Sequence, residues 1–79
     1  MHIIMKLYDA KSGYAGEITF IDGDDRFLSR ITSIGLTEGC HIEIMQNEKK
    51  QPVLLLCRDS LIALNRKDCS RIEVTNTKN

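Results

Sequence analysis

The sequence predicts a mainly β fold: a small, SH3-like, partly open β-barrel of five to six strands with one short α-helix. The chain of 79 residues can hold one hydrophobic core and no second one. Its apolar residues, 42% of the chain, fall in short runs separated by turn residues, and one stretch changes to the period of a helix. We therefore expect a single domain over residues 1–79, with residues 75–79 as a flexible polar tail.

Two short strands are expected before the helix, over residues 3–7 and 17–21. The second run is rich in β-branched and aromatic residues, which favour strands, and the Asp-Gly pair at 22–23 closes it. Gly13 and Gly16 stand at its entry, where we expect both to be turn residues.

Residues 24–34 predict the helix, because apolar side chains recur there at helical spacing and share one face. Asp22 or Asp24 can accept hydrogen bonds from the free amides of its first turn. Gly35 suits the left-handed position after the last turn, and we expect Leu36 to fold back on the helix. The predicted apolar face comprises Phe27, Leu28, Ile31 and Ile34.

The second half of the chain predicts an antiparallel meander, a helical turn and a last strand that closes the sheet. The first strand of the meander alternates between polar and apolar residues, as a half-buried strand does. An asparagine stands where it can cap the helical turn. The expected elements are strands 41–46, 53–58 and 61–64, the helical turn 65–69 and strand 72–74.

The charge balance excludes a strong general attraction to polyanions. Eleven basic residues match eleven acidic ones, so no overall field draws nucleic acid or an anionic membrane. The four aromatic residues are scattered, and Phe20 and Phe27 are expected in the core. The basic pairs at 49–50 and 66–67 are typical of solvated turns. We expect no nucleic-acid partner.

The cysteines and the N-terminal segment indicate a cytoplasmic protein. Cys40, Cys57 and Cys69 form an odd set with no short-spaced pair, so we expect small, buried, unpaired residues in a reducing compartment. The apolar run in residues 1–7 is too short for a signal peptide or a membrane span. We therefore expect no direct insertion into a membrane.

Candidate chemistry is sparse, and the sequence predicts no enzyme. Cys40 and His41 are adjacent on a predicted strand, so they point to opposite faces and cannot act as nucleophile and base. Residues 22–25 look like the start of a calcium loop, but Arg26 and Ser33 stand at ligand positions. No phosphate-binding glycine loop or hydrolase motif occurs. We assign no catalytic residue, metal ligand or cofactor.

The strand over residues 53–58 is apolar on both faces, although a small barrel has one solvent side. We expect residues 59–60 to turn the chain after it, and Arg58 to point outward. Because strand side chains alternate, Leu54 and Leu56 then point outward as well. The inward set is Val53, Leu55 and Cys57.

The neighbouring strands extend this outer surface. If Ile62 and Leu64 are core residues, Leu61 and Ala63 lie outside, and Met45 joins them from the preceding strand. We hypothesise an exposed apolar patch that binds a protein partner or a second copy of this domain, as a homodimer. The alternative is that a chain end covers the patch. Its residues are Met45, Leu54, Leu56 and Leu61.

Several spaced elements together resemble the FeoA family of ferrous-iron transport accessory proteins. They are the run Ile-Gly-Leu-Thr-Glu-Gly at 34–39, the strand at 42–45, Pro52-Val53, and the runs at 61–64 and 72–74. The resemblance implies an SH3-like barrel in the cytoplasm that binds the soluble region of the membrane GTPase carrying ferrous iron, a FeoB-like transporter. It implies neither catalysis nor metal ligands.

Two other functions stay open. The SH3-like C-terminal domain of metal-dependent repressors shares the expected fold, which allows a metal-sensing regulatory domain. That function needs a metal site built from Cys40, His41 or the carboxylates at 22–25. A small nucleic-acid-binding barrel is the third candidate, and salt-dependent binding to single strands would identify it.

Overall fold

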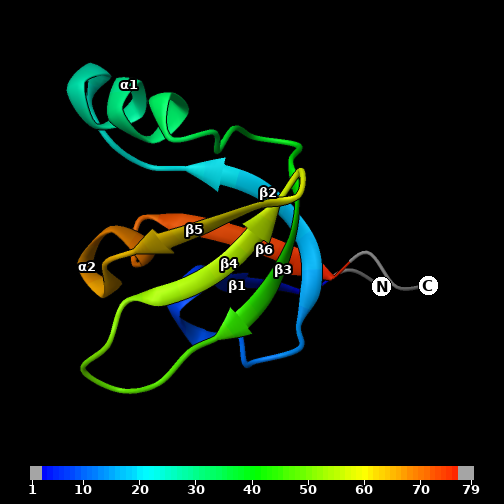
Figure 1. The fold of residues 1–79 in the computed structure, drawn as a ribbon. Coiled ribbons are helices and arrows are strands. Elements are labelled where there is room, and N and C mark those ends of the chain that lie inside the picture. The colour runs from blue at the N-terminus through cyan, green and yellow to red at the C-terminus, as the bar shows by residue number, and fades with distance from the viewer. Residues whose placement is uncertain (1–2, 77–79) are drawn as a thin grey trace.

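The computed structural model describes residues 3–76, which form one curved sheet with two helices at one end (Figure 1). All neighbouring strands are antiparallel, in the order β1-β6-β2-β3-β4-β5. This six-stranded, partly open barrel confirms the predicted fold class. The elements are β1 (Ile4–Lys6), the 3-10 turn η1 (Leu7–Asp9), β2 (Ala15–Ile21), α1 (Asp25–Ser33), β3 (His41–Gln46), β4 (Val53–Cys57), β5 (Ser60–Leu64), α2 (Arg66–Cys69) and β6 (Ile72–Asn76).

Helix α1 begins and ends as its sequence predicts. The Asp24 side chain accepts a hydrogen bond from the Phe27 amide at 2.9 Å, which satisfies one of the free amides of the first turn. Gly35 has φ of +105°, and the Leu36 amide donates to the Ile31 carbonyl at 3.2 Å, which closes the helix end. Leu36 is fully buried, so the chain folds back on the helix there.

Several boundaries differ from the prediction. Leu7 opens η1 instead of ending β1, and its side chain is buried. Gly16 lies inside β2 and not in a turn. Glycine is needed there because a Cβ would overlap the carbonyl oxygen of Thr75 on β6. The turn between β4 and β5 is made by Arg58 and Asp59, both with positive φ, one residue earlier than expected.

Strand β6 inserts between β1 and β2, and it corrects the prediction for the end of the chain. Thr75 pairs with Ile4 on one side and with Glu17 on the other, and its side chain is buried. Thr75 and Asn76 are therefore part of the sheet and not of a flexible tail. The rest of the predicted tail, residues 77–79, lies outside the described residues.

One apolar cluster fills the space between the sheet and the helices. It contains Phe27 and Ile31 from α1 together with the inward-facing residues of β2 to β6. Phe20, expected in the core, is 47% exposed on β2, so that expectation was wrong. The described core comprises Leu7, Ala10, Ile18, Ile21, Phe27, Ile31, Leu36, Cys40, Ile42, Ile44, Val53, Leu55, Cys57, Leu64, Cys69, Ile72 and Val74.

Asn47, after β3, joins three segments that are distant in the sequence. Its side-chain amide donates to the carbonyl oxygens of Tyr8 at 2.9 Å and Ala10 at 2.6 Å. Its side-chain oxygen accepts a hydrogen bond from Arg66 of α2 at 2.5 Å. These bonds satisfy one carbonyl group in η1 and one directly after it.

We expect Asn47→Ala to lower the free energy of unfolding by about 1–3 kcal/mol, because the Ala10 carbonyl loses its side-chain donor and Arg66 loses one of its acceptors. Gln46→Ala is the matched control, since the Gln46 side chain donates one hydrogen bond, to the exposed Glu48 side chain. We expect it to change stability by less than about 0.5 kcal/mol. Urea unfolding of both variants measures the difference, and equal losses would contradict this role for Asn47.

Candidate functional site

The four residues of the predicted patch lie on the outer face of β3, β4 and β5. In the register of the sheet, Leu56 is opposite Leu61, and Leu54 is opposite Ala63. Paired residues share a face, so these side chains project together. Leu61 is 63% exposed and Met45 is 49% exposed. We call Met45, Leu54, Leu56 and Leu61 the leucine face.

The inner face of β4 shows the alternation that the sequence predicts. Val53, Leu55 and Cys57 are buried, while Leu54 and Leu56 between them are half-buried. The two half-buried leucines lie opposite Ala63 and Leu61 in the register with β5. The apolar pairs of the leucine face therefore lie between β4 and β5, while Glu43 and Gln46 lie opposite Leu56 and Leu54 on β3, and Met45 falls at an irregularity of the β3–β4 pairing.

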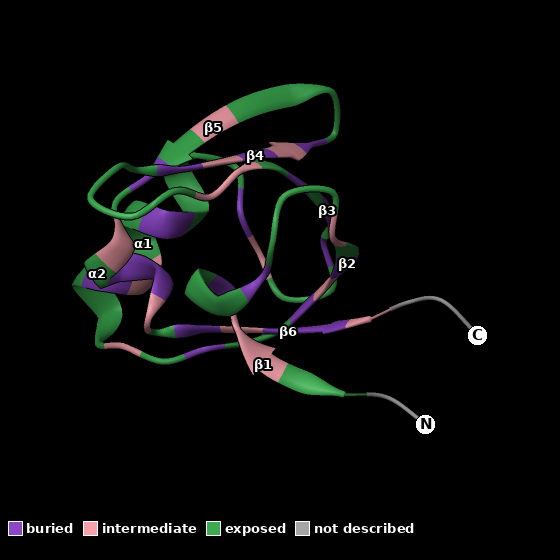
Figure 2. Ribbon diagram, turned by 90° about the horizontal axis from the view of Figure 1, so that it is seen from below, coloured by how far each residue is buried: buried purple, intermediate pink, exposed green. Residues whose placement is uncertain are grey.

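Neither described end of the chain covers the leucine face. Residues 4–6 and 72–76 pair with each other in β1 and β6. Strands β2, β3 and β4 separate β6 from β5 in the sheet order, and β5 forms an edge. Figure 2 shows β5 and β1 on opposite sides of the molecule, with β5 largely exposed. Within residues 3–76, neither β1 nor β6 therefore pairs with β5.

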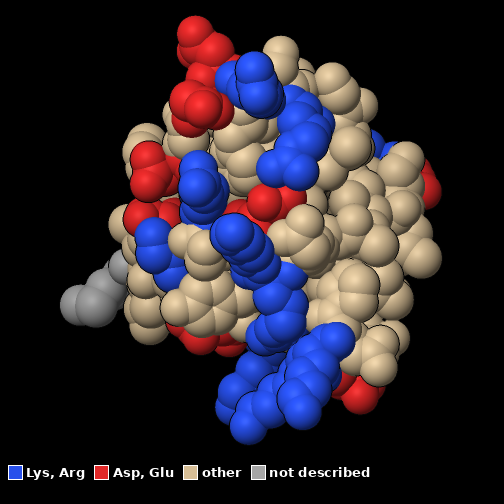
Figure 3. Space-filling view, turned by 90° about the vertical axis from the view of Figure 1, so that its left-hand side faces the viewer, with Lys and Arg blue, Asp and Glu red and all other residues tan. Residues whose placement is uncertain are grey.

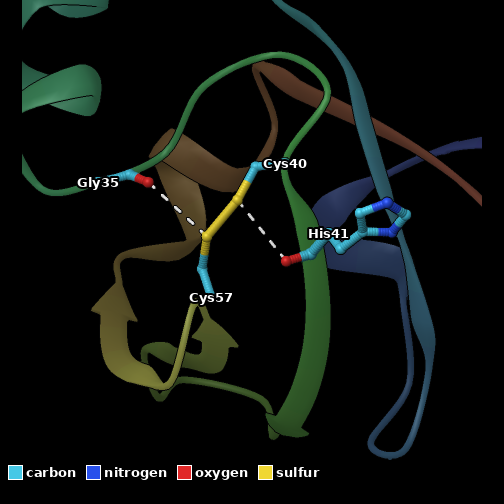
Figure 4. The surroundings of a disulfide bond; sticks show 4 residues. All are labelled: Gly35, Cys40, His41 and Cys57. Carbon is cyan, nitrogen blue, oxygen red and sulfur yellow. Dashed lines mark hydrogen bonds between the residues drawn. A yellow bond between two sulfur atoms is a disulfide. The ribbon is translucent and has the colours of Figure 1, made fainter.

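The structure corrects the prediction that the cysteines are unpaired. Cys40 and Cys57 form a disulfide although 17 positions separate them (Figure 4). Ile42 on β3 is opposite Cys57 on β4, and this register brings Cys40, just before β3, beside Cys57. Sequence spacing alone does not reveal such a pair. The cysteine pattern therefore no longer supports a reducing compartment.

Backbone carbonyl groups also lie close to both sulfur atoms of the pair. The Sγ atom of Cys57 lies 3.7 Å from the Gly35 oxygen, and that of Cys40 lies 3.6 Å from the His41 oxygen (Figure 4). A disulfide sulfur carries no proton, so only reduced thiols can donate across these distances. The surroundings of Cys40 and Cys57 therefore offer acceptors to the two thiols when the disulfide is reduced.

The candidate catalytic and metal positions do not assemble into a site. Cys40 is bound to Cys57, so it supplies no thiolate for His41, whose side chain is exposed. Asp24, from the carboxylate run, caps α1 instead of facing a common centre. In residues 3–76, no three histidine, cysteine or acidic side chains gather as metal ligands.

No helix in the same part of the chain is long and apolar enough to cross a membrane.

Cys69, at the end of α2, is a free thiol with no exposed surface. Burial raises the pKa of the Cys69 thiol to about 12, because the thiolate would lose its hydration. The nearby Arg66 opposes this shift and Asp68 adds to it. Its predicted role as a small buried apolar residue agrees with this environment.

Comparison with known proteins identifies the family and the fold. The family model described as the FeoA domain matches residues 5–76. A solved iron uptake regulatory protein (FeoA) superposes with a TM-score of 0.87 at 21% identity, covering 91% of this chain and 96% of that chain. The FeoA protein from Chlorobium tepidum gives 0.83 at 23% identity, over 94% and 71%. No curated protein sequence matches the chain.

A manganese-dependent transcriptional repressor shares the fold as well. It superposes with a TM-score of 0.85 at 15% identity, and the match covers 96% of this chain but 43% of the repressor. At these identities, the similarity to solved structures concerns the fold alone. The domain therefore occurs both as most of a small chain and as a part of a larger one.

The disulfide closes a loop across a separation of 17 residues. We expect its reduction to lower the free energy of unfolding by about 3 kcal/mol, mainly because the unfolded chain gains freedom. Urea unfolding with and without reductant measures this change. The Cys40→Ser/Cys57→Ser variant is the control, since its stability should not respond to reductant. A wild-type protein with the same midpoint in both conditions would contradict the assignment.

Cys69 should resist alkylation in the folded protein, because a thiol with its pKa near 12 stays protonated and inaccessible at mildly alkaline pH. Mass spectrometry after iodoacetamide treatment should find Cys69 unmodified in the native protein and modified after unfolding in urea. Rapid native labelling would show that α2 opens.

Proposed function

The chain belongs to the FeoA domain family, and on this premise we propose that it is a non-enzymatic accessory protein of ferrous-iron uptake. Its partner is the cytosolic GTPase region of the membrane ferrous-iron transporter, which places the protein in the cytoplasm. The names of the solved relatives support an iron-linked role, since one is an iron uptake regulatory protein and another an iron(II) transport protein.

The leucine face is the observation that carries the docking proposal. Clustered apolar side chains that are exposed or half-buried beside the edge of a sheet are typical of a surface that a partner buries. Strand β5, which bears Leu61, is an edge of the sheet, so its outer backbone N–H and C=O groups are also available for pairing with a partner strand. The partner thus gains both apolar contact and a hydrogen-bonding edge.

The proposal is compatible with the disulfide. A reducing cytoplasm would open the Cys40–Cys57 bond, and the two buried thiols would then find carbonyl acceptors at Gly35 and His41. The backbone pairing of β3 with β4 does not depend on the bond. The fold can therefore persist in its reduced form.

A metal-sensing regulatory domain is the second candidate, supported by the shared fold of the manganese-dependent repressor. A homodimer through the β5 edge is a further arrangement that the exposed leucine face allows. Isothermal titration with ferrous and manganous ions distinguishes the metal-sensing function from the docking function. Light scattering over a concentration series tests the homodimer.

Titration against the purified GTPase region of a ferrous-iron transporter tests the docking function. We expect saturable binding by the wild-type protein, and binding weaker by at least about tenfold in the Met45→Ser/Leu61→Ser variant. These two side chains are exposed, so their replacement should leave the fold intact. Circular dichroism and urea unfolding check that it does.

The matched control is Ile4→Ser/Phe20→Ser. Ile4 is 60% exposed on the edge strand β1, opposite in the sheet to the edge that bears Leu61. Phe20 is 47% exposed on β2, close to the 49% of Met45. The control should bind as the wild type does. Equal weakening of binding in both variants would contradict the leucine face as the docking surface. If the wild-type protein does not bind the GTPase region, with or without nucleotide, the proposed function itself is wrong.

A further inference from the structure

A cleft with basic side chains in its lining lies between α1 and α2. The two helices lie on the side of the molecule away from the chain ends (Figure 1). The volume of the cleft is about 720 Å³. Two residues of α1, one of α2 and one that follows α2 supply its cations. The charged residues that line it are Arg26, Arg30, Lys67 and Arg71, with Asp24 and Asp68.

Both carboxylates of the cleft are used within the protein. Asp24 caps α1 through the Phe27 amide. Asp68 is almost buried, and it accepts from the Asn65 side chain and forms an ion pair with Arg30, each at 3.2 Å. Four basic residues minus these two carboxylates leave an excess of two positive charges in the lining of the cleft.

Three of the four cations remain available to a ligand. In residues 3–76, no carboxylate lies within ion-pair distance of Arg26, Lys67 or Arg71. All three side chains are exposed. The cleft therefore keeps a positive charge although the whole chain has a formal net charge of zero.

Phe27 orients two of the guanidinium groups. The guanidinium carbon atoms of Arg30 and Arg71 lie 5.3 Å and 5.2 Å from the centre of the Phe27 ring. This attraction holds the groups over a buried ring. A positioned guanidinium offers parallel N–H donors that match a carboxylate, and it loses less side-chain entropy on binding.

The positive surface continues beyond the cleft. Figure 3 shows the Lys and Arg side chains of this face as a long band rather than as one spot. Arg66 of α2 donates to the Glu48 carbonyl, so α2 lies beside the loop that bears the exposed Lys49 and Lys50. An extended ligand can follow this band, whereas a single small anion would fill only part of it.

We propose that the cleft binds an acidic segment of a protein partner, rich in aspartate and glutamate. Charge complementarity supports this occupant, and so does the extended shape of the band. Single-stranded nucleic acid needs open aromatic rings for its bases, but Phe27 is 6% exposed and lies beneath two guanidinium groups. A flat lipid surface does not enter a concave cleft. The proposal does not rest on the leucine face or on the transporter.

A titration of the isotope-labelled protein with a synthetic oligoglutamate peptide, followed by NMR at low salt, tests the proposal. We expect saturable shift changes in residues 24–30 and 65–71, and weaker binding as salt is added. Arg26→Glu/Lys67→Glu should weaken binding by at least about fivefold. Both side chains are exposed and form no ion pair within residues 3–76, so the variant should fold.

The matched control is Lys11→Glu/Arg58→Glu, which makes the same change of charge at exposed positions outside the cleft. It should retain wild-type affinity for the peptide. Equal weakening in both variants would overturn the site, since it would reveal only a general charge effect. Tighter binding to oligothymidylate or to phosphatidylserine vesicles than to the peptide would overturn the acidic protein segment as the ligand, as would no saturable binding.

Discussion

The pairing of β6 with both β1 and β2 is the constraint on which the other features depend. Val74 lies opposite Met5 on one side and Ile18 on the other, so the last strand joins the first two into one sheet. This arrangement leaves the β4–β5 hairpin at the far edge, where no described chain end reaches it. The exposure of the leucine face is thus a consequence of topology.

The same pairing places the two helices together. Ile21, at the end of β2, lies opposite Ile72, at the start of β6, and the Asp22 amide donates to the Arg71 carbonyl at 2.7 Å. Helix α1 follows the end of β2, and α2 precedes the start of β6, so both lie at one end of the barrel. The basic cleft between them results from an antiparallel register and not from any local motif.

Local signals explain what the sequence could predict. The alternation of Val53, Leu54 and Leu55 depends only on the period of a strand, and the caps of α1 depend on residues within one turn of it. The disulfide and the cleft depend on register between distant segments, which no local pattern encodes. The formal net charge of zero is a total over the chain, so it carries no information on the local excess of cations in the cleft.

The leucine face and the basic cleft differ in the physical terms that each can contribute to binding. Burial of Leu61 and its neighbours gives affinity that responds little to salt, because it removes apolar surface from water. Exposed cations such as Arg26 and Lys67 contribute less affinity in water, but they steer an acidic partner and favour one orientation. A partner that used both surfaces would therefore show a salt-dependent association rate together with a dissociation rate set mainly by the leucine face.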